Sequence, residues 1–292
     1  MKLQLLYRGP LSSCNYGCQY CPFAKHKESR AELLKDRRAL ERFVRWIGER
    51  PASDQFSVLF TPWGEALIRP WYQEAIITLT NLPQVQKVAI QTNLSCGLGW
   101  VEQCSKPHLA LWATFHPEWV QRKAFVAKCL ELDQRGVRFS VGVVGFPRFR
   151  AEIDALRQAL PSHVYLWINA VKPELPTMSE EELAFFATID PLFRYNTHHY
   201  DSYGLPCGAG FTVVSVAGDG TVRRCHFIPE AIGNLYDPEF KQCLRARPCS
   251  SQHCHCHIGY VHLASLKLNE IFGPGILERI PYHLSPYDQL LG

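Results

Sequence analysis

The chain has 292 residues, of which 47% are hydrophobic and 20% charged, with a formal net charge of +4. This composition is typical of a folded globular protein and excludes a long disordered region. The modest charge excludes a strongly basic nucleic-acid surface. No apolar run reaches the ~20 residues of a membrane span or forms a signal peptide, so we predict a cytoplasmic protein with no membrane partner.

Six segments of the first 170 residues have the composition of β-strands. They are residues 2–7, 55–61, 86–92, 108–114, 137–144 and 163–169. Helical periodicity lies between them, at 30–49, 70–81, 98–106, 118–135 and 150–160. Strands that alternate with helices predict βα units around a parallel sheet. We therefore predict the α/β class, as either an open sheet or a partial (β/α)6 TIM-like barrel, with the site at the carboxyl ends of the strands.

The helix expected at 30–49 has an apolar stripe, made of Leu33, Leu34, Leu40, Phe43, Val44 and Ile47. Ser179, followed by three glutamates, is typical of a helix start. Beyond it, 211–225 reads as a hairpin with a Gly218-Asp219-Gly220 turn. We predict a core domain at 1–195, a small cysteine-rich α+β domain at 196–265 and a tail at 266–292.

Twelve cysteines are a large number for a protein of a reducing compartment, where disulfides are rare. Nine of them fall in two groups, at 14–21 and 207–256. This clustering indicates metal or cluster ligation. We interpret the remaining three, Cys96, Cys104 and Cys129, as core thiols.

The first group, Cys14, Cys18 and Cys21, lies on one short loop after the first strand. A [4Fe-4S] cube normally takes four thiolates, so three leave one iron open to another ligand. An open position is where a metal site does chemistry. The alternative is a zinc site, for which His26 is the one nearby fourth ligand.

The C-x3-C-x2-C spacing, with Tyr20 before its last cysteine, resembles the loop of the radical S-adenosylmethionine (SAM) superfamily, and the resemblance extends over about 195 residues. It implies a [4Fe-4S] cluster on these cysteines, SAM on the fourth iron and Tyr20 against the adenine. It also implies that reductive cleavage of SAM yields a 5'-deoxyadenosyl radical that abstracts hydrogen from a substrate. An electron donor such as flavodoxin or ferredoxin would supply the electron.

Further resemblances lie at the strand ends. Pro62-Trp63-Gly64-Glu65 is similar to the superfamily's Gly-Gly-Glu turn for the SAM ammonium, although Trp63 replaces a glycine and Ala66 the frequent proline. The resemblance implies that Gly64 and Glu65 bind the cofactor. Other strand-end candidates for the cofactor or substrate are Asn93, Thr114, His116, Gly142, where a missing side chain would admit the adenine, and Asn169.

The second group begins with Cys207 and Cys225 in a C-x12-G-x4-C arrangement that resembles twitch and SPASM domains. The resemblance implies an auxiliary [4Fe-4S] cluster held by four of five cysteines, namely Cys207, Cys225, Cys249, Cys254 and Cys256. Of these we choose Cys207, Cys225, Cys254 and Cys256 as the ligands, with Cys249 as the competing candidate. The spacing of a full SPASM domain is absent, which favours the shorter twitch form. Zinc is the alternative, because His253, His255 and His257 alternate with the cysteines.

The substrate stays open between a peptide and a small molecule. No segment before the first strand resembles a domain that grips leader peptides, so a peptide would come from a partner. Relatives with such tails carry out oxidations, crosslinks or other modifications. The rival hypothesis is a non-catalytic zinc- or iron-sulfur-binding interaction module.

Overall fold

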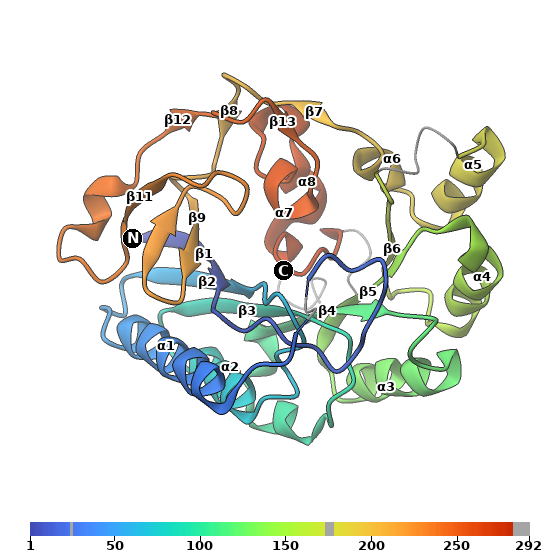
Figure 1. The fold of residues 1–292 in the computed structure, drawn as a ribbon, viewed down its shortest axis with the longest axis horizontal. Coiled ribbons are helices and arrows are strands. Elements are labelled where there is room, and N and C mark those ends of the chain that lie inside the picture. The colour runs from blue at the N-terminus through green and yellow to red at the C-terminus, as the bar shows by residue number, and fades with distance from the viewer. Residues whose placement is uncertain (24–25, 173–177, 283–292) are drawn as a thin grey trace.

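The computed structural model describes residues 1–23, 26–172 and 178–282 (Figure 1). Within these residues the chain forms a nine-stranded sheet in the order β11-β10-β9-β1-β2-β3-β4-β5-β6. The first six strands are β1 (Lys2–Arg8), β2 (Gln55–Phe60), β3 (Val85–Thr92), β4 (Leu109–Phe115), β5 (Arg138–Val144) and β6 (Leu166–Asn169). They pair in parallel from β1 to β6. The predicted α/β class and its six strands are therefore confirmed, and the sheet is consistent with a partial TIM-like barrel.

Helices connect successive strands of this sheet. They are α1 (Arg30–Gly48), α2 (Pro70–Thr80), α3 (Arg122–Gln134) and α4 (Arg150–Ala159). Figure 1 shows these four helices along one side of the curved sheet, with α7 (His257–Tyr260) and α8 (Leu268–Phe272) on the other. None of the helices in the described ranges has both the length and the apolar character of a membrane span.

The helix predicted at 98–106 is wrong. The segment forms two 3-10 turns, Gly99–Gln103 and Lys106–His108. Glycines at 97 and 99 raise the entropic cost of a helix there, and Pro107 lacks the N–H that an α-helix needs. The turns leave the order of the strands unchanged.

Helix α1 begins at a capping box, in which Ser29 and Glu32 each accept a hydrogen bond from the other's backbone N–H. Leu40, Phe43 and Ile47 of the predicted stripe are buried. Leu34 is 44% exposed, so its place in the stripe was wrong. The 3.6-residue repeat that passes through 40, 43 and 47 reaches residue 36 one turn earlier. The buried residue there is Asp36, whose carboxylate contacts the cysteine loop described below.

The two faces of the sheet pack against different partners. On β4, Leu109, Leu111 and Phe115 belong to the core shared with the outer helices, whereas Ala110 and Trp112 belong to a second core on the inner side. Alternate residues of a strand point to opposite faces, which explains the division. The inner core also contains Ile258, Tyr260 and other residues of the C-terminal third.

Residues beyond 195 extend the same sheet. After α5 (Glu180–Ile189), which begins at the predicted Ser179 cap, and α6 (Phe193–Asn196), strand β9 (Val213–Ala217) pairs in parallel with β1. Strands β10 (Thr221–Arg223) and β11 (Ala231–Asn234) follow in antiparallel order, and the predicted turn connects β9 to β10. Gly220 has a φ of +90°, which favours glycine. Two short pairs, β7 (Tyr200–Asp201) with β13 (His253–Cys254) and β8 (Pro206–Cys207) with β12 (Arg247–Pro248), complete this part. The domain boundary near 195 stays a prediction.

The predicted tail places a buried charge on the inner side of the sheet. The Glu278 carboxylate is fully buried and accepts hydrogen bonds from Lys87 on β3 and, at 3.3 Å, from Arg138 on β5. The Arg279 guanidinium lies 4.6 Å from the ring centre of Trp167. Residues 283–292 of the tail lie outside the described residues. These contacts fix the tail across the middle of the sheet.

Replacing Glu278 with alanine should strongly destabilise the protein. The change leaves Lys87 buried without its counter-charge, which costs about 3 kcal/mol of unfolding free energy. Urea denaturation measures this loss. Glu181→Ala, which removes the 78% exposed partner of Arg150, is the matched control and should change little. Equal losses in the two variants would contradict this role for Glu278.

Candidate functional site

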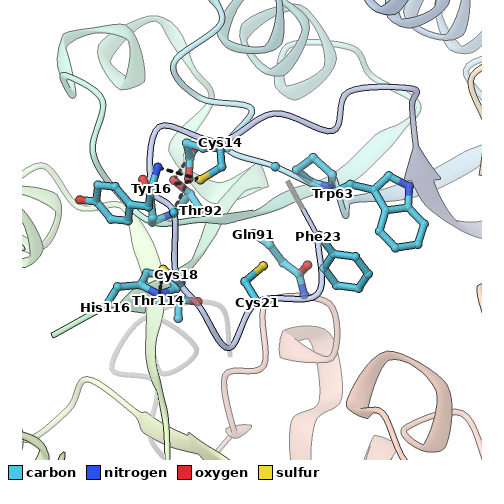
Figure 2. Close-up of a pocket in the computed structure, with 15 residues that line it drawn as sticks. Cys14, Tyr16, Cys18, Cys21, Phe23, Trp63, Gln91, Thr92, Thr114 and His116 are labelled. Atoms are coloured by element: carbon cyan, nitrogen blue, oxygen red, sulfur yellow. Dashed lines mark hydrogen bonds between the residues drawn. The ribbon is translucent and has the colours of Figure 1, made fainter. Parts of the chain in front are cut away.

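The loop between β1 and α1 carries the first three cysteines and lies at the carboxyl ends of the parallel strands (Figure 2). Its backbone pairs with the turn that follows β2. The N–H of Trp63 donates to the carbonyl of Leu11 at 3.3 Å, and the N–H of Glu65 donates to that of Ser13 at 3.1 Å. These two bonds place the start of the cysteine loop directly against the turn.

Gly64 lies between these two bonds. A Cβ atom at this position would lie 1.8 Å from the carbonyl oxygen of Ser13. Only a residue without a side chain allows two backbones to approach so closely. The glycine of the predicted Pro62-Trp63-Gly64-Glu65 turn is therefore required by the packing of the cysteine loop itself.

Side chains that the sequence analysis missed also fix this loop. Asp36 accepts a hydrogen bond from the backbone of Leu11 at 3.1 Å, and Glu28 accepts hydrogen bonds from the Ser12 backbone and the Ser13 hydroxyl. Neither acid stands at a spacing that links it to the cysteines. For Asp36 alone the sequence contains a sign of this role, because this acidic residue falls on the same 3.6-residue repeat as the buried apolar residues of α1.

The three cysteines line one open cavity of about 200 Å³. Figure 2 shows them along a single loop. Five of the predicted strand-end residues line the same cavity, namely Gly64, Glu65, Asn93, Thr114 and His116. The structure thus brings together the residues predicted at the ends of β2, β3 and β4. His26, the zinc candidate, instead lies 3.0 Å from the Ser12 hydroxyl and does not line this cavity.

The environment of Cys14 contains donors that suit a thiolate. Its sulfur accepts a hydrogen bond from the Tyr16 backbone at 3.3 Å and lies 3.7 Å from the Asn93 amide nitrogen. Burial nevertheless raises the pKa of both the Cys14 and Cys18 thiols. A bound metal would displace these protons, because the thiolate is the ligand.

Glu65 is a buried carboxylate held only by neutral donors. It accepts hydrogen bonds from the Thr92 hydroxyl at 2.8 Å and from the backbone N–H groups of Asn93 and Leu67 at 2.5 and 3.0 Å. Burial raises its pKa to about 7. No ion pair links it to a cation within the described part of the chain. A cationic ligand in the cavity would stabilise its ionised form.

Tyr20 and His116 form a pair at one side of the cysteine loop. The Tyr20 hydroxyl lies 2.8 Å from His116 Nδ1, which is itself 3.5 Å from the Cys18 sulfur. Burial lowers the pKa of His116 to about 4, so its ring is neutral. The Tyr20 ring also packs against Phe146, with ring centres 5.3 Å apart. Tyr20 is not among the residues that line the cavity.

Two other predicted residues lie outside this cavity. A Cβ atom at Gly142 would lie only 1.9 Å from the nearest atom of the Trp167 indole. The indole therefore occupies the space that a side chain at this position would need. Gly142 therefore makes room for Trp167, in place of the adenine that we expected. Asn169 ends β6 and lies 3.5 Å from the Asn196 amide, away from the cysteine loop.

The second cysteine group is divided by the fold. Four of its members, Cys207, Cys225, Cys249 and Cys254, line one small cavity of about 20 Å³. Cys256, the fifth candidate, does not line it, and neither does Cys243. In the described ranges, no three His, Cys, Asp or Glu side chains converge as ligands of a single metal ion do. The twelve cysteines all lie in the described ranges and none forms a disulfide, and Cys96, Cys104 and Cys129 are buried.

No protein-family model matches the chain, and no curated protein matches it. Solved structures do match. The structure of anSMEcpe with bound AdoMet and Kp18Cys peptide superposes with a TM-score of 0.54 at 14% identity, over 84% of this chain and 81% of that one. The anSMEcpe structure with AdoMet and Cp18Cys peptide superposes with a TM-score of 0.51 at 15% identity, over 82% of this chain and 79% of that one. The structure of BtrN in complex with AdoMet and 2-DOIA gives a TM-score of 0.36 at 14% identity, over 86% of this chain and 95% of that one. The likeness to anSMEcpe shows that this chain shares the fold of that protein.

Gly64→Ala should loosen the cysteine loop. The new methyl group must displace the Ser13 carbonyl, so we expect a loss of about 2 kcal/mol in stability and faster proteolytic cleavage of the loop. Thermal denaturation and limited proteolysis measure the two effects. Gly97→Ala is the control, because a Cβ there meets nothing within 4 Å. A Gly64 variant as stable and protease-resistant as the Gly97 variant would contradict the proposed packing role.

Proposed function

We propose that this chain is a radical SAM enzyme whose first cysteine group holds a [4Fe-4S] cluster. The observation that carries the proposal is one cavity lined by three thiols from one loop and by the buried carboxylate of Glu65. The fold shared with anSMEcpe, whose structure contains AdoMet, supports it. The three sulfurs of Cys14, Cys18 and Cys21 suit a cube with one open iron.

The groups around the cavity fit the polar parts of SAM. Glu65 would accept the ammonium of its methionine moiety, since a charge-assisted hydrogen bond is strong in a buried site. Asn93, whose amide nitrogen donates to Asn15 at 3.0 Å, would orient the same moiety, and Thr114 would contact the ribose. Tyr20, supported by His116 and Phe146, would lie beside the adenine. When bound, the cluster and SAM supply a 5'-deoxyadenosyl radical that abstracts hydrogen from the substrate.

We propose that Cys207, Cys225, Cys249 and Cys254 bind an auxiliary [4Fe-4S] cluster. Their joint lining of one cavity supports this choice over any set that includes Cys256. Four thiolates are the usual ligand set of such a cluster. Burial, followed by the electrostatic effect of the neighbouring cysteines, raises the pKa of Cys254 to about 12, and a bound metal would lower it again.

For the substrate we propose a peptide or a small molecule, with a flavodoxin or ferredoxin as electron donor. The Kp18Cys and Cp18Cys peptides in the anSMEcpe structures support the peptide. The reaction class would be an oxidation, a crosslink or a related modification.

Variants of the two cysteine groups test the cofactors. Anaerobically reconstituted protein should contain about eight iron atoms per chain and release 5'-deoxyadenosine from SAM with dithionite. Replacing Cys14, Cys18 and Cys21 together with alanine should lower iron to about four and abolish 5'-deoxyadenosine. Replacing Cys207 and Cys225 should also lower iron to about four. Cys104→Ala, a buried thiol outside both cavities, is the control for loss of a cysteine.

Two results would overturn the proposal. Fully reconstituted protein that releases no 5'-deoxyadenosine would refute the radical function. Zinc in place of iron at both cysteine groups, measured by metal analysis, would favour the non-catalytic binding module instead.

SAM affinity should depend on pH through Glu65. Its pKa near 7 in the free site must fall when an ammonium binds, so binding below pH 7 has to remove a proton. We expect the affinity to fall by up to tenfold per pH unit below about 7 and to level off above it. Anaerobic calorimetry from pH 6 to 8 measures this. Glu65→Gln should bind SAM more weakly at pH 8 and lose the pH dependence; an unchanged slope would exclude Glu65 as the titrating group.

A further inference from the structure

A third cavity, of about 390 Å³, lies between those of the two cysteine groups. Trp63 lines both this cavity and that of the cysteine loop, whereas Phe227 lines both this cavity and that of the second cysteine group. One aromatic side chain therefore separates it from each. Both rings are partly open to solvent, with exposed fractions of 37% and 41%. The volume falls in the range of roughly 300–1,000 Å³ that small-molecule sites occupy.

The charged groups of this cavity are all positive. Arg8, from the end of β1, and Arg223, from the end of β10, both line it, and its lining among the described residues includes no carboxylate. Neither guanidinium forms an ion pair with any described acid. Two cations without counter-charge on one wall create a site for an anion.

Both guanidinium groups are held through a single nitrogen. Arg8 Nε donates to the Thr61 carbonyl at 2.9 Å, and Arg223 Nε donates to the Pro229 carbonyl at 2.9 Å. Arg8 also lies 4.3 Å from the ring centre of Trp63. The terminal nitrogens of both arginines have no hydrogen-bond acceptor within the described part of the chain. A guanidinium fixed in this way offers two parallel donors to a carboxylate or phosphate.

His226 also lines the cavity. Its Nε2 lies 2.8 Å from the Thr61 hydroxyl and its Nδ1 lies 2.5 Å from that of Ser215. Both ring nitrogens are thus engaged by neighbouring hydroxyl groups, which leaves the terminal nitrogens of the two arginines as the donors available to an anion.

We propose that this cavity binds an anionic group of the substrate, a carboxylate or a phosphate, and so holds the substrate between the two cysteine groups. Arg8 and Arg223 bind the anion, while Trp63 and Phe227 contact the adjoining part of the substrate. The role of the ligand as substrate rests on the radical function proposed above. The binding of an anion does not, so the two can fail separately.

Anion titrations test the site without SAM or reductant. The probes are glutarate, inorganic phosphate and the neutral glutaramide, followed by calorimetry at constant ionic strength. We expect saturable binding of glutarate or phosphate, none of glutaramide, and at least tenfold weaker binding in both Arg8→Gln and Arg223→Gln. The anion that binds more tightly identifies the group that the substrate carries. Arg8→Lys, which keeps the charge but loses the planar fork, should give an intermediate affinity.

Arg50→Gln is the matched control. Its guanidinium is also held by Nε on a backbone carbonyl, that of Trp46 at 3.2 Å, and lies 4.8 Å from the ring centre of the same tryptophan, but it lies outside this cavity. This variant should bind the anion as the unaltered protein does. No saturable anion binding, or binding unchanged in both Arg8→Gln and Arg223→Gln, would overturn the proposal. Anion binding by protein that forms no 5'-deoxyadenosine would leave the site standing and refute only the radical function.

Discussion

Two backbone hydrogen bonds between the cysteine loop and the turn after β2 position the main site of this protein. They require the chain to approach itself so closely that Gly64 has no room for a methyl group. The same turn then presents Glu65, whose carboxylate is held by Thr92 and Asn93 of the next strand. One constraint on the backbone thus places the thiols and the buried acid in a common cavity.

The inner side of the sheet depends on segments from the C-terminal third. Glu278 neutralises Lys87 and Arg138 on two different strands, and its neighbour Arg279 lies over Trp167. The indole of Trp167 in turn occupies the space that Gly142 leaves. These contacts fill the sheet's interior below the strand ends.

The pairing of β9 with β1 connects the two cysteine groups. It brings His226 within hydrogen-bond distance of Thr61, which lies 165 residues earlier in the chain. His226 also contacts the hydroxyl of Ser215. The cationic cavity is a product of this pairing, because Arg8 comes from β1 and Arg223 from β10. A substrate held there would have a cysteine group on either side.

Local patterns determined much of the fold and of the first site. Alternation every two residues and repeats of 3.6 residues come from backbone geometry, so six strands and most of their helices could be predicted. Cys14, Cys18 and Cys21 are close in sequence, and Glu65, Asn93 and Thr114 lie at or just after the carboxyl ends of parallel strands, which meet at one edge. Their prediction depended on this placement and on the resemblance of their motifs to a known superfamily.

Only the tertiary structure decided the rest. Spacing alone favoured Cys256 over Cys249, whereas Cys249 lines the cavity with Cys254 and Cys256 does not. Nor did spacing place Trp167 over Gly142 or show that Asp36 replaces Leu34 on the buried side of α1. Nor did it join Arg8 to Arg223, which are more than two hundred residues apart. Such contacts depend on which segments pack together once the sheet has formed. A short stretch of sequence records its own periodicity and spacing, but not the distant residues that it will touch.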